Sequence, residues 1–177
     1  MRCFIAIDMP ADAEAEARRI QAMFGMKGLR KTKSFHLTLK FLGETDRQRL
    51  EASKEKLRDI KLPRFSLELS KIGVFPDEKR ARVLWIGLDG DAARLQKEID
   101  EKLSGISDKD NRFHPHITLA RISYPDDKER FLELLSTEVK KIRFDVKSFA
   151  LYKSTLTRDG PIHEKIEEYH LSPESTS

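Results

Sequence analysis

The sequence repeats itself at a spacing of 80 residues, and this duplication limits the folds that the chain can adopt. The tetrad His-x-Thr-Leu occurs at residues 36–39 and again at residues 116–119. An apolar run opens each half of the sequence, RCFIAID from residue 2 and RVLWIGL from residue 82. Self-similarity at a fixed period indicates repeated structural units. We therefore expect two similar halves related by an approximate two-fold axis.

Each half contains the same five elements in the same order, which predicts a β-α-β-α-β unit. The first helix of each half has an apolar face at helical spacing. These faces comprise Ala13, Ala17, Ile20 and Phe24 in the first half and Ala92, Leu95, Ile99 and Leu103 in the second. The second helix of the first half should begin at a capping box formed by Thr45 and Gln48. Each half closes on an extended segment, FSLELSKIGVF from residue 65 and FDVKSFALY from residue 144.

These elements predict an α+β fold with two pseudo-symmetric lobes. Each lobe should be an antiparallel sheet with two helices, and the lobes should face each other across a central cleft. One domain covers residues 1–177, with duplicated halves at about 1–76 and 81–155, and a C-terminal strand at about 163–170. The turn-rich segment PDEKRA, residues 76–81, joins the halves.

Composition restricts the setting in which the protein works. The single cysteine, Cys3, excludes an internal disulfide and a cysteine-based zinc cluster, so we predict a reducing, cytoplasmic location. No apolar run approaches the length of a membrane span, and no membrane partner is expected. We expect a monomer.

The net charge is only +4, but the positive charge is unevenly placed. Four basic residues crowd the approach to the first His-x-Thr, namely Lys27, Arg30, Lys31 and Lys33. A local positive field of this kind suits an anionic ligand such as a nucleic acid.

The repeated tetrads place chemistry-bearing side chains together on a strand. Side chains two positions apart on a strand share a face, so His36 lies beside Thr38. The same alternation places Lys40 on this polar face and Leu37, Leu39 and Phe41 on the opposite, core face. In the second copy, His116 and Thr118 share a face with His114.

Two imidazoles and two hydroxyls fit the hydrolysis of a phosphodiester. One histidine can take a proton from water while the other gives one to the departing oxygen. The hydroxyls can donate hydrogen bonds to the non-bridging oxygens, where the transition state concentrates negative charge. A five-membered cyclic phosphate is a natural substrate, because its ring strain assists opening without a metal.

The motifs HLTLKFLGE, HITLAR, GVFP and RVLWIGL resemble those of the two-histidine (2H) phosphoesterase superfamily. Within it they are similar to the RNA 2′,3′-cyclic phosphodiesterases, also described as 2′-5′ RNA ligases. The resemblance extends from Phe4 to about Ile166. It implies metal-independent opening of an RNA terminal 2′,3′-cyclic phosphate to a 2′-phosphate, together with weak, reversible 2′-5′ ligation. The implied partner is RNA with such an end, for example tRNA fragments, and no cofactor is implied.

The resemblance also implies roles for individual residues. His36 would be the general acid toward the leaving 3′ oxygen, and His116 the general base toward the attacking water. Thr38, Thr118 and Arg121 would bind the phosphate. Phe41 corresponds to an aromatic residue that can stack on the terminal base.

Local charge and strand alternation add Lys33, Lys40 and His114 as candidate RNA contacts. Two of the family assignments conflict with a regular strand, because Arg121 and Phe41 lie five positions past their histidines. Arg121 would reach the cleft if the strand bulged near Ala120. Relatives often carry an aromatic residue where this chain has His163, which leaves a substrate contact there open.

Other functions remain to be weighed against this one. A zinc site built from His114, His116 and either His163 or His170 lacks a carboxylate or cysteine at a recognisable metal spacing, so no metal is predicted. A Ser-His-Asp hydrolase would need a Gly-x-Ser-x-Gly elbow, which the sequence lacks. Two alternatives stay open: a non-catalytic RNA-end binding protein, and a related cyclic-nucleotide or oligonucleotide phosphodiesterase.

Overall fold

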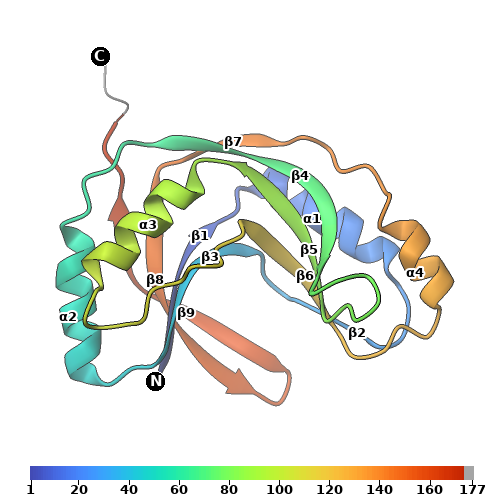
Figure 1. Ribbon diagram of the computed structural model, residues 1–177, viewed down its shortest axis with the longest axis horizontal. Coiled ribbons are helices and arrows are strands. Elements are labelled where there is room, and N and C mark those ends of the chain that lie inside the picture. The colour runs from blue at the N-terminus through green and yellow to red at the C-terminus, as the bar shows by residue number, and fades with distance from the viewer. Residues whose placement is uncertain (174–177) are drawn as a thin grey trace.

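The computed structural model of the chain describes residues 1–173, which form a strongly curled sheet with helices at its two ends (Figure 1). The strands are β1 (Arg2–Asp8), β2 (Leu29–Lys31), β3 (His36–Glu44), β4 (Phe65–Phe75), β5 (Val83–Gly90), β6 (His116–Ile122), β7 (Arg143–Val146), β8 (Ser148–Thr157) and β9 (Gly160–His170). The helices are α1 (Ala11–Met23), α2 (Arg47–Arg58), α3 (Ala92–Lys102) and α4 (Lys128–Leu134). None of these helices is both long and apolar enough to cross a membrane.

The order of the strands reflects the duplication. The sheet runs β7-β4-β5-β6-β3-β1-β8-β9, and β2 pairs with β6 outside this path. The two strands that carry the repeated tetrads, β6 and β3, lie at the centre. Outward from them come β5 and β1, and then β4 and β8, which are equivalent elements of the two halves. The predicted α+β architecture with two pseudo-symmetric lobes is confirmed.

The halves of the sequence exchange elements, which a simple side-by-side arrangement of two repeats would not do. β4, from the first half, pairs with β5 of the second half, and β8 pairs with β1. Helix α3 packs against β3 and α1 packs against β6. In Figure 1, α2 and α3 lie together at one end of the sheet and α1 and α4 at the other. The short turn at residues 76–82 explains part of this exchange, because it joins β4 to β5 as a hairpin.

The apolar helix faces predicted from the sequence are confirmed, since all eight of their residues are fully buried. Cys3 is also buried, as an apolar residue of β1. The predicted capping box is wrong, because α2 begins one residue later than expected. The carboxylate of Asp46 accepts from the backbone N–H of Arg49 at 2.8 Å, and the Thr45 hydroxyl donates to the carbonyl of Gly43.

The two C-terminal strands form a long hairpin that projects beyond the rest of the sheet (Figure 1). β9 begins at Gly160, three residues before the predicted start of the strand, and pairs with the whole of β8. Because β8 also pairs with β1, the hairpin carries His163 into the lobe that contains β1 and β3.

Candidate active site

The two repeated tetrads meet at the centre of the sheet. Leu37 of β3 pairs with Ile117 of β6 in antiparallel register, and both side chains are fully buried. They are the middle residues of the two His-x-Thr pairs, so both pairs flank one point on the opposite face of the sheet. The four polar side chains are partly exposed on that face, namely His36, Thr38, His116 and Thr118.

Both central strands contain a β-bulge at the same place in the repeat. In β3, Thr38 lies opposite Ala6 and Lys40 lies opposite Ile5, so Leu39 is skipped in the register. In β6, the register passes from Thr118 to residue 120 and skips Leu119. A bulge inserts one residue into a strand and so reverses the alternation of faces beyond it.

The bulges resolve the conflict over Arg121 and Phe41, which both lie beyond them. Arg121 is exposed and lies on the face of His116, whose pKa is lowered by burial and, further, by the charge of Arg121. Phe41 is 73% exposed, and its ring centroid lies 6.3 Å from that of Phe4 beside His36. Strand alternation alone was therefore wrong in placing Phe41 in the core.

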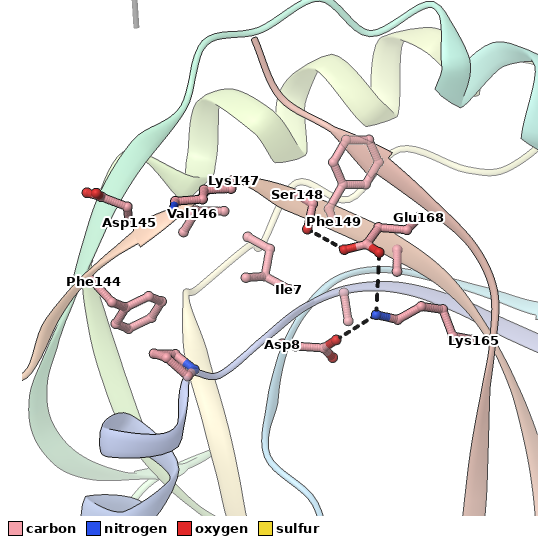
Figure 2. A pocket seen from close by; sticks show the side chains of 13 residues that line it. Ile7, Asp8, Phe144, Asp145, Val146, Lys147, Ser148, Phe149, Lys165 and Glu168 are labelled. Atoms are coloured by element: carbon pink, nitrogen blue, oxygen red, sulfur yellow. Dashed lines mark hydrogen bonds and ion pairs between the residues drawn. The ribbon is translucent and has the colours of Figure 1, made fainter. Parts of the chain in front are cut away.

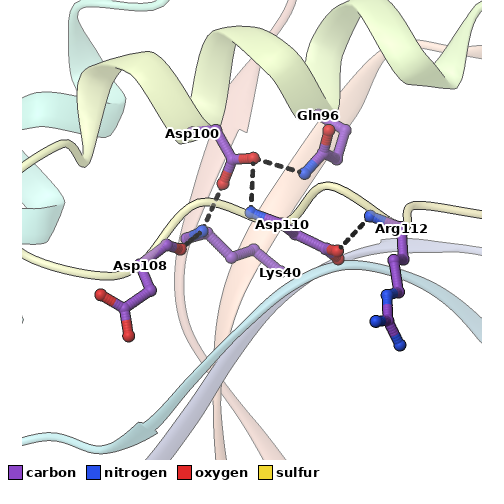
Figure 3. Close-up of polar contacts among 6 residues, drawn as sticks. All are labelled: Lys40, Gln96, Asp100, Asp108, Asp110 and Arg112. Atoms are coloured by element: carbon purple, nitrogen blue, oxygen red, sulfur yellow. Dashed lines mark hydrogen bonds and ion pairs between the residues drawn. The ribbon is translucent and has the colours of Figure 1, made fainter.

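The same bulge overturns the prediction that Lys40 contacts RNA. Lys40 is only 4% exposed and points to the core, where its ammonium forms an ion pair with the carboxylate of Asp100 (Figure 3). It also donates to the backbone carbonyl of Asp108 at 2.6 Å. The carboxylate of Asp100 accepts two further hydrogen bonds, from the Gln96 amide at 2.9 Å and from the Asp110 N–H at 3.0 Å.

Aromatic rings surround His36. Phe4 stacks on the imidazole with centroids 5.1 Å apart, and Tyr152 stacks on Phe4 at 5.2 Å. His163 meets His36 edge-on at 5.3 Å, a contact that no sequence pattern indicated. A pocket of about 330 Å³ opens beside these rings, and Lys33 contributes to its lining, next to His36.

This enclosure perturbs the His36 imidazole strongly. Burial lowers the pKa of His36 to about 4, and the charges of His163 and His116 act in the same direction. The charge of Asp8 opposes them, because a nearby carboxylate favours the imidazolium. His36 is therefore neutral near pH 7 in the unliganded protein.

Asp8 is a site residue that the sequence reasoning missed. It lies opposite His36 in the register of β1 with β3 and accepts a hydrogen bond from the Tyr152 hydroxyl. Figure 2 shows the Lys165 ammonium between the carboxylates of Asp8 and Glu168, at 3.1 Å from Asp8. These three residues line a second cavity of about 210 Å³. The available signal was a carboxylate at the end of a first strand that is apolar from Cys3 to Ile7.

The His116 imidazole is held by a backbone contact. Its Nδ1 lies 2.6 Å from the carbonyl oxygen of His114. A carbonyl can only accept, so Nδ1 carries the proton and Nε2 of the neutral ring has a free lone pair. The rings of Phe75 and Trp85 enclose His116 from one side, at 5.0 and 6.1 Å between centroids. Burial lowers the pKa of His116, and the His114 carbonyl opposes this effect.

The other histidines are divided between the lobes. The His114 ring packs against Phe75 and Trp85 next to His116, whereas His163 lies beside His36. Across residues 1–173, no three His, Cys, Asp or Glu side chains are grouped as the ligands of a metal ion.

A family model described as the 2′-5′ RNA ligase superfamily matches residues 9–158. The chain belongs to this superfamily. The membership predicted from the paired motifs is thereby confirmed.

Relatives within the superfamily match nearly the whole chain. The RNA 2′,3′-cyclic phosphodiesterase of Methanocaldococcus jannaschii is 39% identical over 176 residues, which cover 96% of this chain and 100% of that protein. The crystal structure of TT0787 of Thermus thermophilus superimposes with a TM-score of 0.88 at 26% identity and covers 99% of this chain and 100% of its own. E. coli LigT complexed with 3′-AMP has a TM-score of 0.75 at 25% identity, with 97% of each chain covered.

Proposed function

We propose that this protein hydrolyses the terminal 2′,3′-cyclic phosphate of RNA to a 2′-phosphate. The observation that carries the proposal is the meeting of two His-x-Thr pairs around the paired residues Leu37 and Ile117. Relatives named RNA 2′,3′-cyclic phosphodiesterase support the substrate class. The complex of E. coli LigT with 3′-AMP supports a ribonucleotide with a phosphate on its 3′ side.

In the proposed step, Nε2 of His116 takes a proton from water, and the water oxygen attacks phosphorus. The bond from phosphorus to the 3′ oxygen breaks, and His36 donates a proton to that oxygen. The phosphate stays on the 2′ oxygen. The hydroxyls of Thr38 and Thr118 and the guanidinium of Arg121 bind the non-bridging oxygens, which carry the transition-state charge.

The surroundings of the two histidines support different roles. The His114 carbonyl fixes the tautomer of His116 that presents a basic Nε2. His36 must gain a proton before it can act as an acid, because its pKa lies near 4 in the free protein. A bound phosphate supplies the negative charge that raises this pKa, and Asp8 acts in the same direction.

The same site can join RNA ends by the same displacement with a different nucleophile. If the 5′ hydroxyl of a second RNA replaces water, the same displacement of the 3′ oxygen forms a 2′-5′ phosphodiester. The description of the matched superfamily as 2′-5′ RNA ligase supports a joining activity, which we propose is weak and reversible. We include fragments of tRNA with cyclic phosphate ends among the proposed substrates.

The test is hydrolysis of a short RNA that ends in a 2′,3′-cyclic phosphate, with excess chelator present. Wild type, His36→Ala and His116→Ala are compared, and the product isomer is identified. We expect conversion to the 2′-phosphate by wild type and a loss of about 10²- to 10⁴-fold in either variant. Binding without turnover by wild type would contradict the proposal in favour of an RNA-end binder.

A second substrate assigns the two roles. In a cyclic substrate whose 3′ oxygen is replaced by sulfur, the leaving group departs without a proton. The His36→Ala variant should then regain most of its lost activity, whereas His116→Ala should not. Recovery in His116→Ala alone would reverse the assignment. Faster turnover of cyclic nucleotides or linear oligonucleotides in a substrate panel would favour the related phosphodiesterases.

A further inference from the structure

The short strand β2 places a second arginine next to Arg121. β2 pairs with β6 so that Leu29 lies opposite Ile122 and Arg30 opposite Arg121. Leu29 and Ile122 both pack into the core. Because side chains alternate along a strand, Arg30 and Arg121 share the other face of the sheet, which is the face of the active site.

Two arginines at directly opposite positions repel each other. Directly opposite side chains on antiparallel strands have Cβ atoms about 4.5–5.5 Å apart, and like charges at this distance are destabilising. Both residues are exposed. Among residues 1–173, neither guanidinium has a carboxylate within ion-pair distance. A bound anion would relieve this repulsion.

The strand that carries Arg30 is held firmly against the active-site strand. Thr32 donates from its N–H to the carbonyl of Leu119 at 3.0 Å and from its hydroxyl to the carbonyl of Thr118 at 2.9 Å. The Gln21 amide, which is buried, donates to the carbonyls of Thr32 and Leu119 at 2.9 and 2.8 Å. These bonds attach β2 to the bulge of β6, so Arg30 is presented from a fixed backbone.

The position of Arg30 relative to His116 indicates which phosphate it would meet. Because β5 occupies one edge of β6, with Val83 opposite Arg121, β2 and β3 share the other edge. Arg30 therefore lies one strand spacing, about 4.8 Å, from Arg121, beyond the end of β3 that carries His36. Arg121 reaches the cyclic phosphate in the proposed reaction. Arg30 then lies beside that phosphate, beyond His36, where it can meet a neighbouring phosphate of the same RNA.

We propose that Arg30 binds a second phosphate of the RNA, the 5′ phosphate of the terminal nucleotide, next to the cyclic phosphate that Arg121 holds. This inference rests on the proposed function and specifies its substrate further. A nucleoside 2′,3′-cyclic phosphate lacks the second phosphate, whereas every RNA end has it. The arginine pair thus selects RNA ends over free cyclic nucleotides.

The test compares three substrates: a nucleoside 2′,3′-cyclic phosphate, the same compound with a 5′ phosphate, and a dinucleotide with a 2′,3′-cyclic phosphate end. Arg30→Gln should lower kcat/KM about tenfold for the two substrates that carry the second phosphate, through KM, because one charge-assisted contact is lost. For the nucleoside cyclic phosphate the change should stay below about twofold.

Lys31→Gln is the matched control, since it removes the same charge from the next residue of the same strand. Lys31 lies opposite Ala120, a position whose side chain faces the core. The kcat/KM of the Lys31→Gln variant should change by less than about twofold on all three substrates. An equal loss in both variants would mean a general positive field, and an equal loss on all three substrates would place Arg30 on the cyclic phosphate. Either result overturns the second site.

A binding measurement separates this inference from the proposed activity. Calorimetry on the wild type should show that adenosine 3′,5′-bisphosphate binds more tightly than 3′-AMP, and Arg30→Gln should remove most of the difference. This comparison needs no turnover. Equal affinities in the wild type would overturn the second phosphate site even if hydrolysis were observed. Absence of hydrolysis with unequal affinities would reject only the proposed reaction.

Discussion

The bulges of β3 and β6 have the same place in the repeat, but different side chains lie beneath them. Behind the β3 bulge lies the buried ion pair of Lys40 with Asp100. The residues 80 positions away, Ala120 and Ile20, are both apolar and buried. The β6 bulge forms without an ion pair, so the change of face does not depend on one.

The two halves instead use different chemistry to hold equivalent loops. The loop before β6 is held against β3 by Lys40, which donates to the Asp108 carbonyl, and against α3 by Asp100, which accepts from the Asp110 N–H. The loop before β3 is held against β6 by the neutral amide of Gln21. Both equivalent loops are therefore fixed to a neighbouring strand. One half uses a charged pair of side chains for this contact, and the other half uses a neutral amide.

The largest expected effect comes from breaking the ion pair. Lys40→Met leaves the Asp100 carboxylate buried without its cation and should lower the free energy of unfolding by about 3–5 kcal/mol. Gln21→Met removes the hydrogen bonds of the neutral amide and should lower the free energy of unfolding by about 1–3 kcal/mol. Urea unfolding of both variants provides the measurement. Equal losses of stability in the two variants would contradict the distinction between the charged contact of Lys40 and the neutral contact of Gln21.

The double variant Lys40→Met with Asp100→Leu sharpens this comparison. It removes both charges and should recover most of the stability lost in Lys40→Met.

Burial alone raises the pKa of Asp100, but hydrogen bonds from Lys40, Asp110 and Gln96 outweigh it and hold the pKa below its usual value. The stabilisation from this carboxylate is therefore present above its unfolded pKa and is lost as pH falls through the folded value.

The next effect compares the two threonines of the active site. Thr38→Val and Thr118→Val each remove one hydroxyl donor to the phosphate, and each should lower kcat by about 10²-fold. Their unfolding curves should match the wild type. Thr155→Val, on the exposed part of β8, is the control and should leave kcat unchanged. A loss in only one of the two variants would show that the half-sites bind the phosphate unequally.

The pH dependence of kcat/KM compares the two imidazoles. Hydrolysis needs one protonated and one neutral histidine, so the profile should be bell-shaped. It should fall below about pH 4, where both imidazoles are protonated and His116 has no free lone pair to act as the base. It should fall again above the lowered pKa of His116, where both imidazoles are neutral and His36 has no proton to donate. A maximum at pH 7 or above would contradict the lowered pKa values.

The smallest effects test the two neighbours of His36. His163→Gln removes a charge that disfavours the imidazolium, so the pKa of His36 should rise. Asp8→Asn removes the opposing charge, so the pKa of His36 should fall further. The imidazole signals are followed by NMR titration. Shifts of the same sign in both variants would mean that burial, and not these two charges, controls His36.

Local patterns were sufficient for much of the fold. The helix faces that begin at Ala13 and Ala92 follow from the 3.6-residue period, which depends only on neighbouring positions. The paired tetrads at His36 and His116 share their strand faces for the same kind of reason, since the two-residue period holds up to the bulge. The exact start of α2 was missed because two neighbouring residues, Thr45 and Asp46, are both good caps.

The sequence by itself determined the duplication, the helix faces and the pairing of His with Thr, because each is a periodic property of adjacent residues. Only the tertiary structure decided which face Lys40, Phe41 and Arg121 occupy, because a bulge exists only in register with a neighbouring strand. Only the tertiary structure places His163 beside His36 and Arg30 beside Arg121, through pairings between strands far apart in the chain. Contacts of that kind depend on the exchange of strands between the halves, which no local pattern encodes.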